Sequence, residues 1–143
     1  MKSQEILKNI FTNINIVKVE NQNVDYEGII FEDNKAVRYR SRLAKKTPKK
    51  DGYFVAFYER ENNKNKPFNE LISMDFLIIL VDDESKKGIF IIPKAECIKK
   101  GITSSSTSKG KMAMRFYPNW CKDLNSTALK TQKWQSLYFR IIN

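Results

Sequence analysis

Three arginines at alternate positions are the residues of this sequence best suited to binding phosphate. Arg38, Arg40 and Arg42 lie in the run Arg-Tyr-Arg-Ser-Arg. In an extended strand their guanidinium groups would project from one face, roughly 6–7 Å apart, which is close to the phosphate repeat along one nucleic-acid strand. The row therefore predicts a phosphate-binding arm. The alternative is a solvated edge strand whose charges prevent aggregation, and such an exposed row would contribute little to stability.

Basic residues continue beyond the arginine row. The segment from Lys35 to Lys50 contains eight basic residues and no acidic one. Its second half reads Lys-Lys-Thr-Pro-Lys-Lys, which is turn-like and adds four positive charges. We therefore expect a lysine tip on the same arm, formed by Lys45, Lys46, Lys49 and Lys50.

The charges of the chain are segregated along the sequence. The formal net charge is +10, from 26 basic and 16 acidic residues. Residues 35–50 and residues 98–143 each sum to +8, so the rest of the chain sums to −6. Solubility alone would need only mixed signs, whereas segregated charge predicts a polyanionic partner, most commonly nucleic acid. An anionic membrane surface is the weaker alternative, because no amphipathic helix accompanies the basic segments.

Composition limits the class of protein further. A chain of 143 residues with 41% hydrophobic content is expected to form a single domain, residues 1–143, with a real core. It has no apolar run of about 18 residues and no signal sequence at its start, which predicts a cytoplasmic location. Cys97 and Cys121 lack a zinc pattern and are expected to be packing thiols. The absence of histidine excludes Ser-His and Cys-His catalysis but leaves Mg²⁺-assisted hydrolysis open.

The hydrophobic pattern predicts alternating helices and strands. Helical spacing of apolar residues covers about the first fourteen positions, and short strands are expected at 26–31 and 38–43. Three later segments are apolar on both faces, which is typical of strands in the middle of a covered sheet: residues 53–58, 76–81 and 89–92. We expect them to be successive central strands, the last two joined by the polar loop 82–88.

The second half of the chain continues this organisation. Pro93 should open a short helix that Gly101 ends, and residues 102–110 should form a mobile loop. Lys109 and Lys111 at its end either contact the ligand or belong to a plain linker.

The last segments comprise a strand and a closing helix. In the strand predicted for residues 112–117, Arg115 and Tyr117 share one face. A helix from about Ser126 would carry Trp134, Leu137, Tyr138 and Ile141 as a core-facing stripe. The expected fold is α/β, with a mixed central sheet and flanking helices.

Several motifs resemble those of a known family. They are Phe116-Tyr117-Pro118-Asn119-Trp120, Lys130-Thr131-Gln132-Lys133-Trp134-Gln135, Tyr138-Phe139, Gly88-Ile89-Phe90-Ile91-Ile92-Pro93-Lys94 and Lys100-Gly101-Ile102. From about Tyr26 onward the chain resembles the MepB family of small basic bacterial proteins, named from a multidrug-efflux gene cluster. The resemblance implies a fold similar to the PD-(D/E)XK nucleases, an incomplete active site and a nucleic-acid-binding role.

The nuclease pattern can be compared with the sequence directly. It needs an Asp at the start of one strand and a (D/E)-x-K at the end of the next, because two carboxylates hold the metal and the lysine positions water. Pairing of 75–81 with 89–94 places Asp75 opposite Lys94, but Ile92 occupies the second carboxylate position. Glu96, two residues beyond Lys94, and Glu59, at the end of the neighbouring predicted strand, are possible substitutes. The alternative for Asp75 is a purely structural salt bridge with Lys94.

These observations predict a cytoplasmic nucleic-acid-binding protein with a degenerate nuclease-like site, no hydrolytic activity and no cofactor. The residues expected to contact nucleic acid are Arg38, Arg40, Arg42, Lys45, Lys46, Lys49, Lys50, Lys109, Lys111, Arg115 and Tyr117, with a weaker stacking role for Tyr39. Two alternatives stay open: a Mg²⁺-dependent nuclease using Asp75, Glu96 and Lys94, or a module that binds an acidic protein. The sequence leaves open the choice between DNA and RNA, and the oligomeric state.

Overall fold

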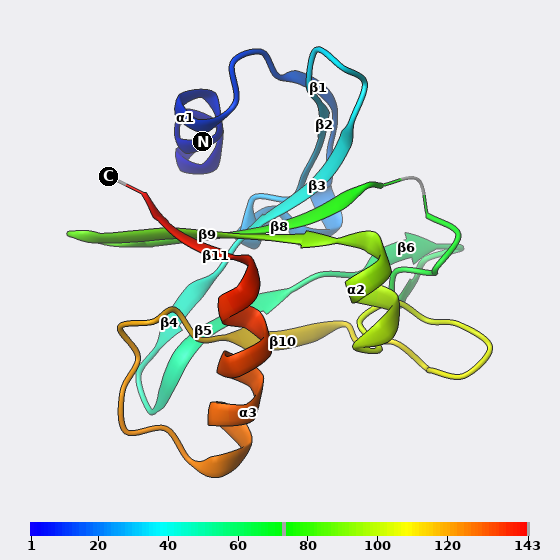
Figure 1. The fold of residues 1–143 in the computed structure, drawn as a ribbon. Coiled ribbons are helices and arrows are strands. Elements are labelled where there is room, and N and C mark those ends of the chain that lie inside the picture. Colours follow the sequence, from blue (N-terminus) through cyan, green and yellow to red (C-terminus); the bar gives the residue numbers. More distant parts are fainter. Residues whose placement is uncertain (73, 143) are drawn as a thin grey trace.

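A computed structural model describes residues 1–72 and 74–142 (Figure 1). In chain order its elements are α1 (Lys2–Ile10), β1 (Asn15–Val19), the 3₁₀ helix η1 (Asn21–Tyr26), β2 (Ile29–Glu32), β3 (Arg38–Leu43), β4 (Lys45–Thr47), β5 (Lys50–Ala56), β6 (Glu59–Glu61), β7 (Lys64–Lys66), β8 (Phe76–Asp83), β9 (Lys86–Pro93), α2 (Lys94–Lys99), β10 (Ala113–Phe116), α3 (Ser126–Gln135), the 3₁₀ helix η2 (Ser136–Tyr138) and β11 (Phe139–Ile142).

A six-stranded mixed sheet forms the centre of the molecule. Its strand order is β1-β2-β3-β8-β9-β11, and the pair β3–β8 is parallel while the other neighbours are antiparallel. The α/β class with a mixed central sheet and flanking helices is therefore confirmed. Within the described residues, strands outnumber helices.

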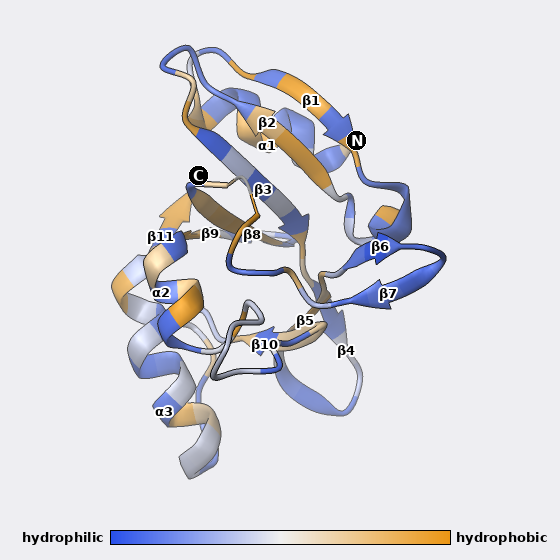
Figure 2. Ribbon diagram, turned by 90° about the vertical axis from the view of Figure 1, so that its right-hand side faces the viewer, coloured by the Kyte–Doolittle hydropathy of each residue, from blue (hydrophilic) through white to orange (hydrophobic). Residues whose placement is uncertain are grey.

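The strand at 53–58 does not lie in this central sheet, contrary to the sequence-based expectation. It becomes β5, the middle strand of a separate three-stranded sheet with the order β10-β5-β4. This small sheet packs below the large one in Figure 1. The sequence could not distinguish the two arrangements, because the outward face of β5 also carries an aromatic residue, Phe54, and its apolar run therefore looks like that of a strand covered on both faces. A separate hydrophilic hairpin, β6–β7, projects from the body in Figure 2.

Two hydrophobic clusters lie on opposite faces of β8 and β9. The inter-sheet core lies between the two sheets and includes Leu77, Ile79 and Phe90 with Val55 and Phe116. The α1-side core lies on the other face, where Ile78, Leu80 and Ile89 pack with Leu7, Ile29, Phe31 and Tyr39. Figure 1 shows α1 above β8 and β9, and the small sheet, α2 and α3 below them. As predicted, β8 and β9 are apolar on both faces because both faces of these strands are covered.

The ends of the chain differ from the expectation. The first helix ends at Ile10, and Asn15–Val19 pairs with β2 as a strand. The closing helix begins at Ser126 as predicted, capped by the Asn125 side chain, but it ends at Gln135. Residues 139–142 form β11, which pairs with β9. Of the predicted stripe, Trp134 and Tyr138 pack partly against the inter-sheet core, whereas Leu137 and Ile141 are 78% and 54% exposed, so the prediction is wrong for these two residues. The described helices include none both long and apolar enough to cross a membrane.

The predicted hairpin and its following helix are confirmed. The strands extend to Asp83 and from Lys86, so that the turn is only Glu84 and Ser85. Pro93 precedes α2, and Gly101 follows it with a φ of +69°. Residues 102–110 form bends and one isolated bridge, Asn69 with Ser104, as expected for a loop.

Candidate nucleic-acid interface

The three arginines of β3 share one face, as their spacing predicted, but that face is not exposed. Arg42 is fully buried, and Arg40 is 7% exposed. Arg38 forms an ion pair with Glu32, its direct neighbour on β2, with Nη2 2.8 Å from Oε2. The prediction of an exposed phosphate-binding row is therefore wrong. It failed because the face that β3 turns away from the α1-side core lies against η1 and Phe68, so solvent does not reach it.

The buried guanidinium groups are held by acidic and amide partners. Arg40 donates to Glu20 through Nε and Nη2, and to Glu59 Oε1 through Nη1 at 2.9 Å. Arg42 donates to Glu20 Oε1 at 2.9 Å and to Asn23 Oδ1 at 2.8 and 3.1 Å. The Phe68 ring lies 4.0 Å from Cζ of Arg40 and 5.4 Å from that of Arg42. Since cations buried in a protein need such compensation, this ion network is structural.

Local sequence explains how Glu20 and Asn23 reach the arginines. Glu20 begins the turn of η1, and Glu27 ends it in the left-handed region with a φ of 46°. Gly28 follows, and a Cβ atom there would lie 3.1 Å from the Arg42 guanidinium. Gly28 therefore permits the close approach of the η1 loop to Arg42.

The ion network predicts sensitivity to acid. Burial raises the pKa of Glu20, but hydrogen bonds and the charges of Arg40 and Arg42 outweigh it and lower the pKa from 4.5 to about 2. A carboxyl with a lowered folded-state pKa stabilises above its unfolded pKa and loses that contribution as the pH falls towards the folded one. We expect the free energy of unfolding to fall between pH 4.5 and 2. Urea unfolding at several pH values across this range would measure how steeply the free energy of unfolding depends on pH. Glu20→Gln should reduce this slope by up to about 1.4 kcal/mol per pH unit.

The control for acid sensitivity is Glu61→Gln, because Glu61 forms an exposed pair with Lys66. This variant should keep the slope of the parent. Equal slopes for the parent and Glu20→Gln would contradict the assignment.

Tyr39 lies in the α1-side core and is 7% exposed. Its ring stacks on Phe31 and Phe76, with centroids 4.8 and 5.6 Å apart. Its hydroxyl donates to Asp33, and burial followed by this contact raises the pKa of Tyr39 to about 12. A role in stacking on bases is therefore excluded for Tyr39.

The predicted neighbourhood of Asp75 and Lys94 is confirmed, but the predicted salt bridge is not formed. Phe76 pairs with Pro93, and the Lys94 N–H donates to the carbonyl of Asp75 at 3.0 Å. The Asp75 carboxylate instead accepts from the Arg38 N–H at 2.8 Å. The Lys94 ammonium donates to the carbonyl of Ile72 at 2.8 Å. The two side chains thus stabilise neighbouring backbone rather than each other.

The carboxylates proposed for a nuclease centre are engaged elsewhere. Ile92 is fully buried in the inter-sheet core. Glu96 accepts a hydrogen bond from the Tyr138 hydroxyl at 2.9 Å, and Glu59 pairs with Arg40. In the described part of the chain, no group of three acidic or cysteine side chains could hold a metal ion. These residues do not fit the Mg²⁺ ion of the alternative nuclease.

The outer face of the small sheet carries basic and aromatic side chains, of which Lys45 is exposed and the others are half-buried. Lys45, Phe54 and Arg115 are direct neighbours across β4, β5 and β10, so they share the face that points away from the inter-sheet core. Arg115 Cζ lies 5.7 Å from the Phe54 ring, and Tyr26 packs edge-on against Phe54. Lys45 Nζ lies 5.1 Å from the Tyr26 ring. We call Tyr26, Lys45, Phe54, Arg115 and Tyr117 the outer face.

Tyr117 has a fixed position at the end of this face. It lies two residues beyond Arg115, directly after β10. A Cβ atom on Gly52 would lie 2.6 Å from the Tyr117 ring, and Gly52 has a φ of +81°. Gly52 thus provides both the backbone conformation and the space that seat the Tyr117 ring on β5.

Two hollows lie between the outer face and α3. The larger has a volume of about 380 Å³ and is lined by Lys49, Lys50, Asp51, Arg115, Tyr117, Leu124, Asn125, Thr127 and Ala128. The smaller, about 210 Å³, is lined by Lys100, Lys111, Met114, Arg115, Tyr117, Thr131 and Trp134. Arg115 and Tyr117 line both hollows, so the two lie next to each other. The predicted residues Lys49, Lys50, Lys111, Arg115 and Tyr117 are therefore brought together.

Two other predicted lysines lie apart from these hollows. Lys46 is on β4 opposite Tyr53, and its ammonium is 3.7 Å from the Asp83 carboxylate. Lys109 is exposed in the loop before β10. Neither lines the two hollows.

Comparisons with known proteins identify the family. The MepB-like family model matches residues 20–140. The chain belongs to the MepB-like family. A solved structure described as a crystal structure of MepB is 43% identical in sequence, with a TM-score of 0.88, and the match covers 100% of this chain and 98% of that one. Among the curated proteins compared, none matches.

The MepB-like range contains both the buried ion network and the outer face, since it begins at Glu20 and extends beyond Tyr117. Sequence reasoning missed Phe54, Tyr26, Lys100 and Trp134 as neighbours of the basic residues. Phe54 was hidden in a run apolar on both faces, and only the pairing of Lys45, Phe54 and Arg115 reveals its outward position. Trp134 was expected in the core, and it does pack partly against it while also lining the smaller hollow.

Proposed function

We propose that this MepB-like chain binds nucleic acid through the outer face and its two hollows, with phosphate contacts dominating and little sequence preference. The observation that carries the proposal is the cross-strand row of Lys45, Phe54 and Arg115, continued by Tyr117 beside a hollow that also contains Lys49 and Lys50. Cations beside aromatic rings suit a strand whose phosphates and unpaired bases are both accessible. We therefore propose single strands as the preferred ligand.

The buried arginines have no part in this proposal. Arg40 and Arg42 cannot reach phosphate without breaking their contacts to Glu20. The interface thus rests on residues of β4, β5, β10 and the loops around them. Asp51 also lines the larger hollow and would repel phosphate, so the ligand should follow the Lys49, Lys50 and Arg115 side of it.

A degenerate nuclease-like centre remains part of the proposal. The adjacency of Asp75 and Lys94 supports the resemblance to PD-(D/E)XK nucleases, while the buried Ile92 supports the loss of hydrolysis. We propose that the protein binds without cleaving and needs no cofactor. The cytoplasm, where nucleic acid is accessible, is the proposed location.

The test is a titration of the purified protein with fluorescent single-stranded DNA, single-stranded RNA and duplex DNA between 50 and 200 mM salt. Affinity should fall linearly on a log–log plot, with a slope near −0.7 per phosphate contact on single strands and −0.9 on duplex. Two unrelated sequences of equal length should bind alike, and each substrate should stay intact after incubation with Mg²⁺ or Mn²⁺.

Polyglutamate of matched charge is the control for an acidic protein partner. Binding to polyglutamate with no measurable affinity for any nucleic acid would replace the proposal with a protein-interaction module. Cleavage that disappears in Asp75→Asn and in Lys94→Gln would instead support the nuclease alternative.

A further inference from the structure

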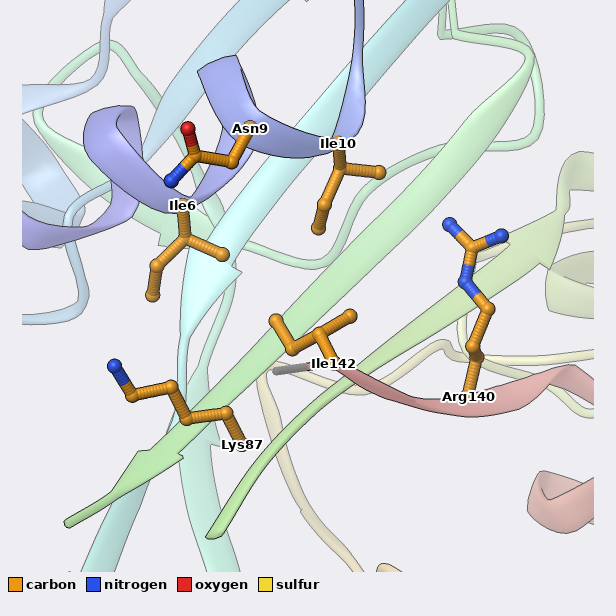
Figure 3. A pocket seen from close by; sticks show the side chains of 6 residues that line it. All are labelled: Ile6, Asn9, Ile10, Lys87, Arg140 and Ile142. Atoms are coloured by element: carbon orange, nitrogen blue, oxygen red, sulfur yellow. The ribbon is translucent and has the colours of Figure 1, made fainter. Parts of the chain in front are cut away.

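A groove lies on the opposite side of the large sheet from the outer face. It has a volume of about 350 Å³ between α1 and the edge strand β11. Figure 3 shows Ile6 and Ile10 on α1 pointing towards Ile142 on β11, with Asn9 beside them. The three isoleucines are only partly buried around the α1-side core. The groove is therefore an apolar trough open to solvent.

Two cations flank the apolar floor. Ile142 is paired with Lys87 on β9, and Arg140 lies two residues before Ile142 on the same face of β11. Lys87 and Arg140 are therefore diagonal neighbours across β9 and β11, and such residues lie about 7–8 Å apart. Figure 3 shows Lys87 and Arg140 on either side of Ile142. An anionic group beside Ile142 would thus meet a cation on both sides.

The charges around the groove leave these cations available. Asp82 lies opposite Lys87 in the β8–β9 pair, but its carboxylate is 3.9 Å from the Lys2 ammonium. Among the ion pairs of the described residues, none involves Lys87 or Arg140. Arg140 is exposed at the rim of the groove, and its guanidinium carries five N–H donors.

We propose that this groove is a binding site for a small amphiphilic carboxylate, with the aliphatic chain between α1 and Ile142 and the carboxylate on Arg140, assisted by Lys87. The volume is at the lower end of ligand pockets, which suits a single short chain rather than a two-chain lipid. The planar guanidinium of Arg140 matches a carboxylate with two parallel hydrogen bonds. The site is independent of the nucleic-acid interface, because the large sheet separates them.

The probes for the test are acetate, hexanoate, octanoate and octan-1-ol, added to ¹⁵N-labelled protein at fixed salt. Affinity should rise from acetate to octanoate, because each buried methylene contributes about 0.8 kcal/mol, or about fourfold. Octan-1-ol, which has the chain without the charge, should bind at least tenfold more weakly than octanoate. Shifts should centre on α1, Lys87 and β11, and octyl phosphate shows whether another anionic head is accepted.

The variant Lys87→Gln/Arg140→Gln should weaken octanoate binding at least tenfold while leaving octan-1-ol unchanged. Its matched control is Arg60→Gln/Lys130→Gln, which removes two exposed cations outside the groove. The control should bind octanoate like the parent. Three results would overturn the proposal: equal affinity for octanoate and octan-1-ol, equal affinity of the variant and its control, or a dimer, detected by sedimentation, that covers β11 and excludes octanoate.

Discussion

Replacing Arg42 with alanine is expected to lower the free energy of unfolding by about 3–5 kcal/mol, the usual cost of breaking a buried ion pair from one side. The buried Glu20 carboxylate would lose its hydrogen bond and ion pair with Arg42. Asn23 Oδ1 would lose the two hydrogen bonds that it accepts from the Arg42 side chain. It also leaves a cavity beside Gly28, where the Arg42 guanidinium packs in the native protein. Urea unfolding followed by circular dichroism would measure the loss.

The control for this prediction is Arg38→Ala. Arg38 pairs with Glu32 at the surface, and its side chain is 30% exposed. A pair of that kind contributes at most about 1 kcal/mol. A similar loss for both variants would show that burial of the ion network does not determine its contribution. Loss of nucleic-acid binding in an Arg42 variant would accordingly report unfolding rather than a lost phosphate contact.

The second large effect concerns binding. Replacing Lys45, Lys49, Lys50 and Arg115 together with glutamine should weaken binding to single-stranded nucleic acid at 50 mM salt on the order of a hundredfold. The magnitude of the salt slope should fall by about 3, because each lost phosphate contact contributes about 0.7 on single strands. Fluorescence anisotropy at several salt concentrations would measure both quantities. The thermal midpoint should change little, because the three lysines are exposed and Arg115 makes surface contacts with Thr47 and the Asp51 carbonyl.

A matched variant separates a specific surface from the loss of four charges. Lys8, Lys18, Lys35 and Lys64 are exposed on α1, β1, a loop and β7, away from the outer face. Changing all four to glutamine removes the same charge and should weaken binding far less. If both variants lose affinity equally, only the overall charge attracts nucleic acid, and the outer face is not the interface.

The periodicity of the sequence predicted individual strands better than their arrangement. The positions of β3, β8 and β9 follow from alternating or continuous apolar residues, because these patterns depend on the local geometry of a strand, although β8 and β9 extend further into the polar turn than predicted. The assignment of β5 to a second sheet depends on contacts with residues far along the chain. A run of apolar residues indicates a strand but does not say which strands pair with it, so the pattern carries no information about the choice.

Charge was the least reliable guide to exposure. The β3 arginines and the lysine tip belong to one basic segment, but the structure buries two of the arginines and leaves the lysines exposed. The acidic partner of Arg40 and Arg42 is Glu20, some twenty residues earlier and outside that segment. An arginine whose compensating carboxylate is distant in sequence looks like a surface residue until the chain is folded.

The two-sided burial of β8 and β9 has a consequence for strand alignment. In most sheets a slip by one residue turns apolar side chains towards solvent and is strongly disfavoured. Here Leu77 and Ile79 would merely exchange sides with Ile78 and Leu80, since both faces are dry. The interior of the hairpin therefore does little to distinguish the native alignment from its neighbours.

Discrimination must come from features that occur once along the hairpin. At the turn end Asp82 and Asp83 are register neighbours of Lys87 and Lys86, close enough for opposite charges to attract although their carboxylates form ion pairs with Lys2 and Lys46. At Gly88 the Phe139 ring packs directly on the backbone of β9, since a Cβ atom there would lie 2.3 Å from the ring. A slipped hairpin would place a bulkier side chain under Phe139 and separate the opposite charges. The polar turn and one glycine thus encode an alignment that the hydrophobic residues leave ambiguous.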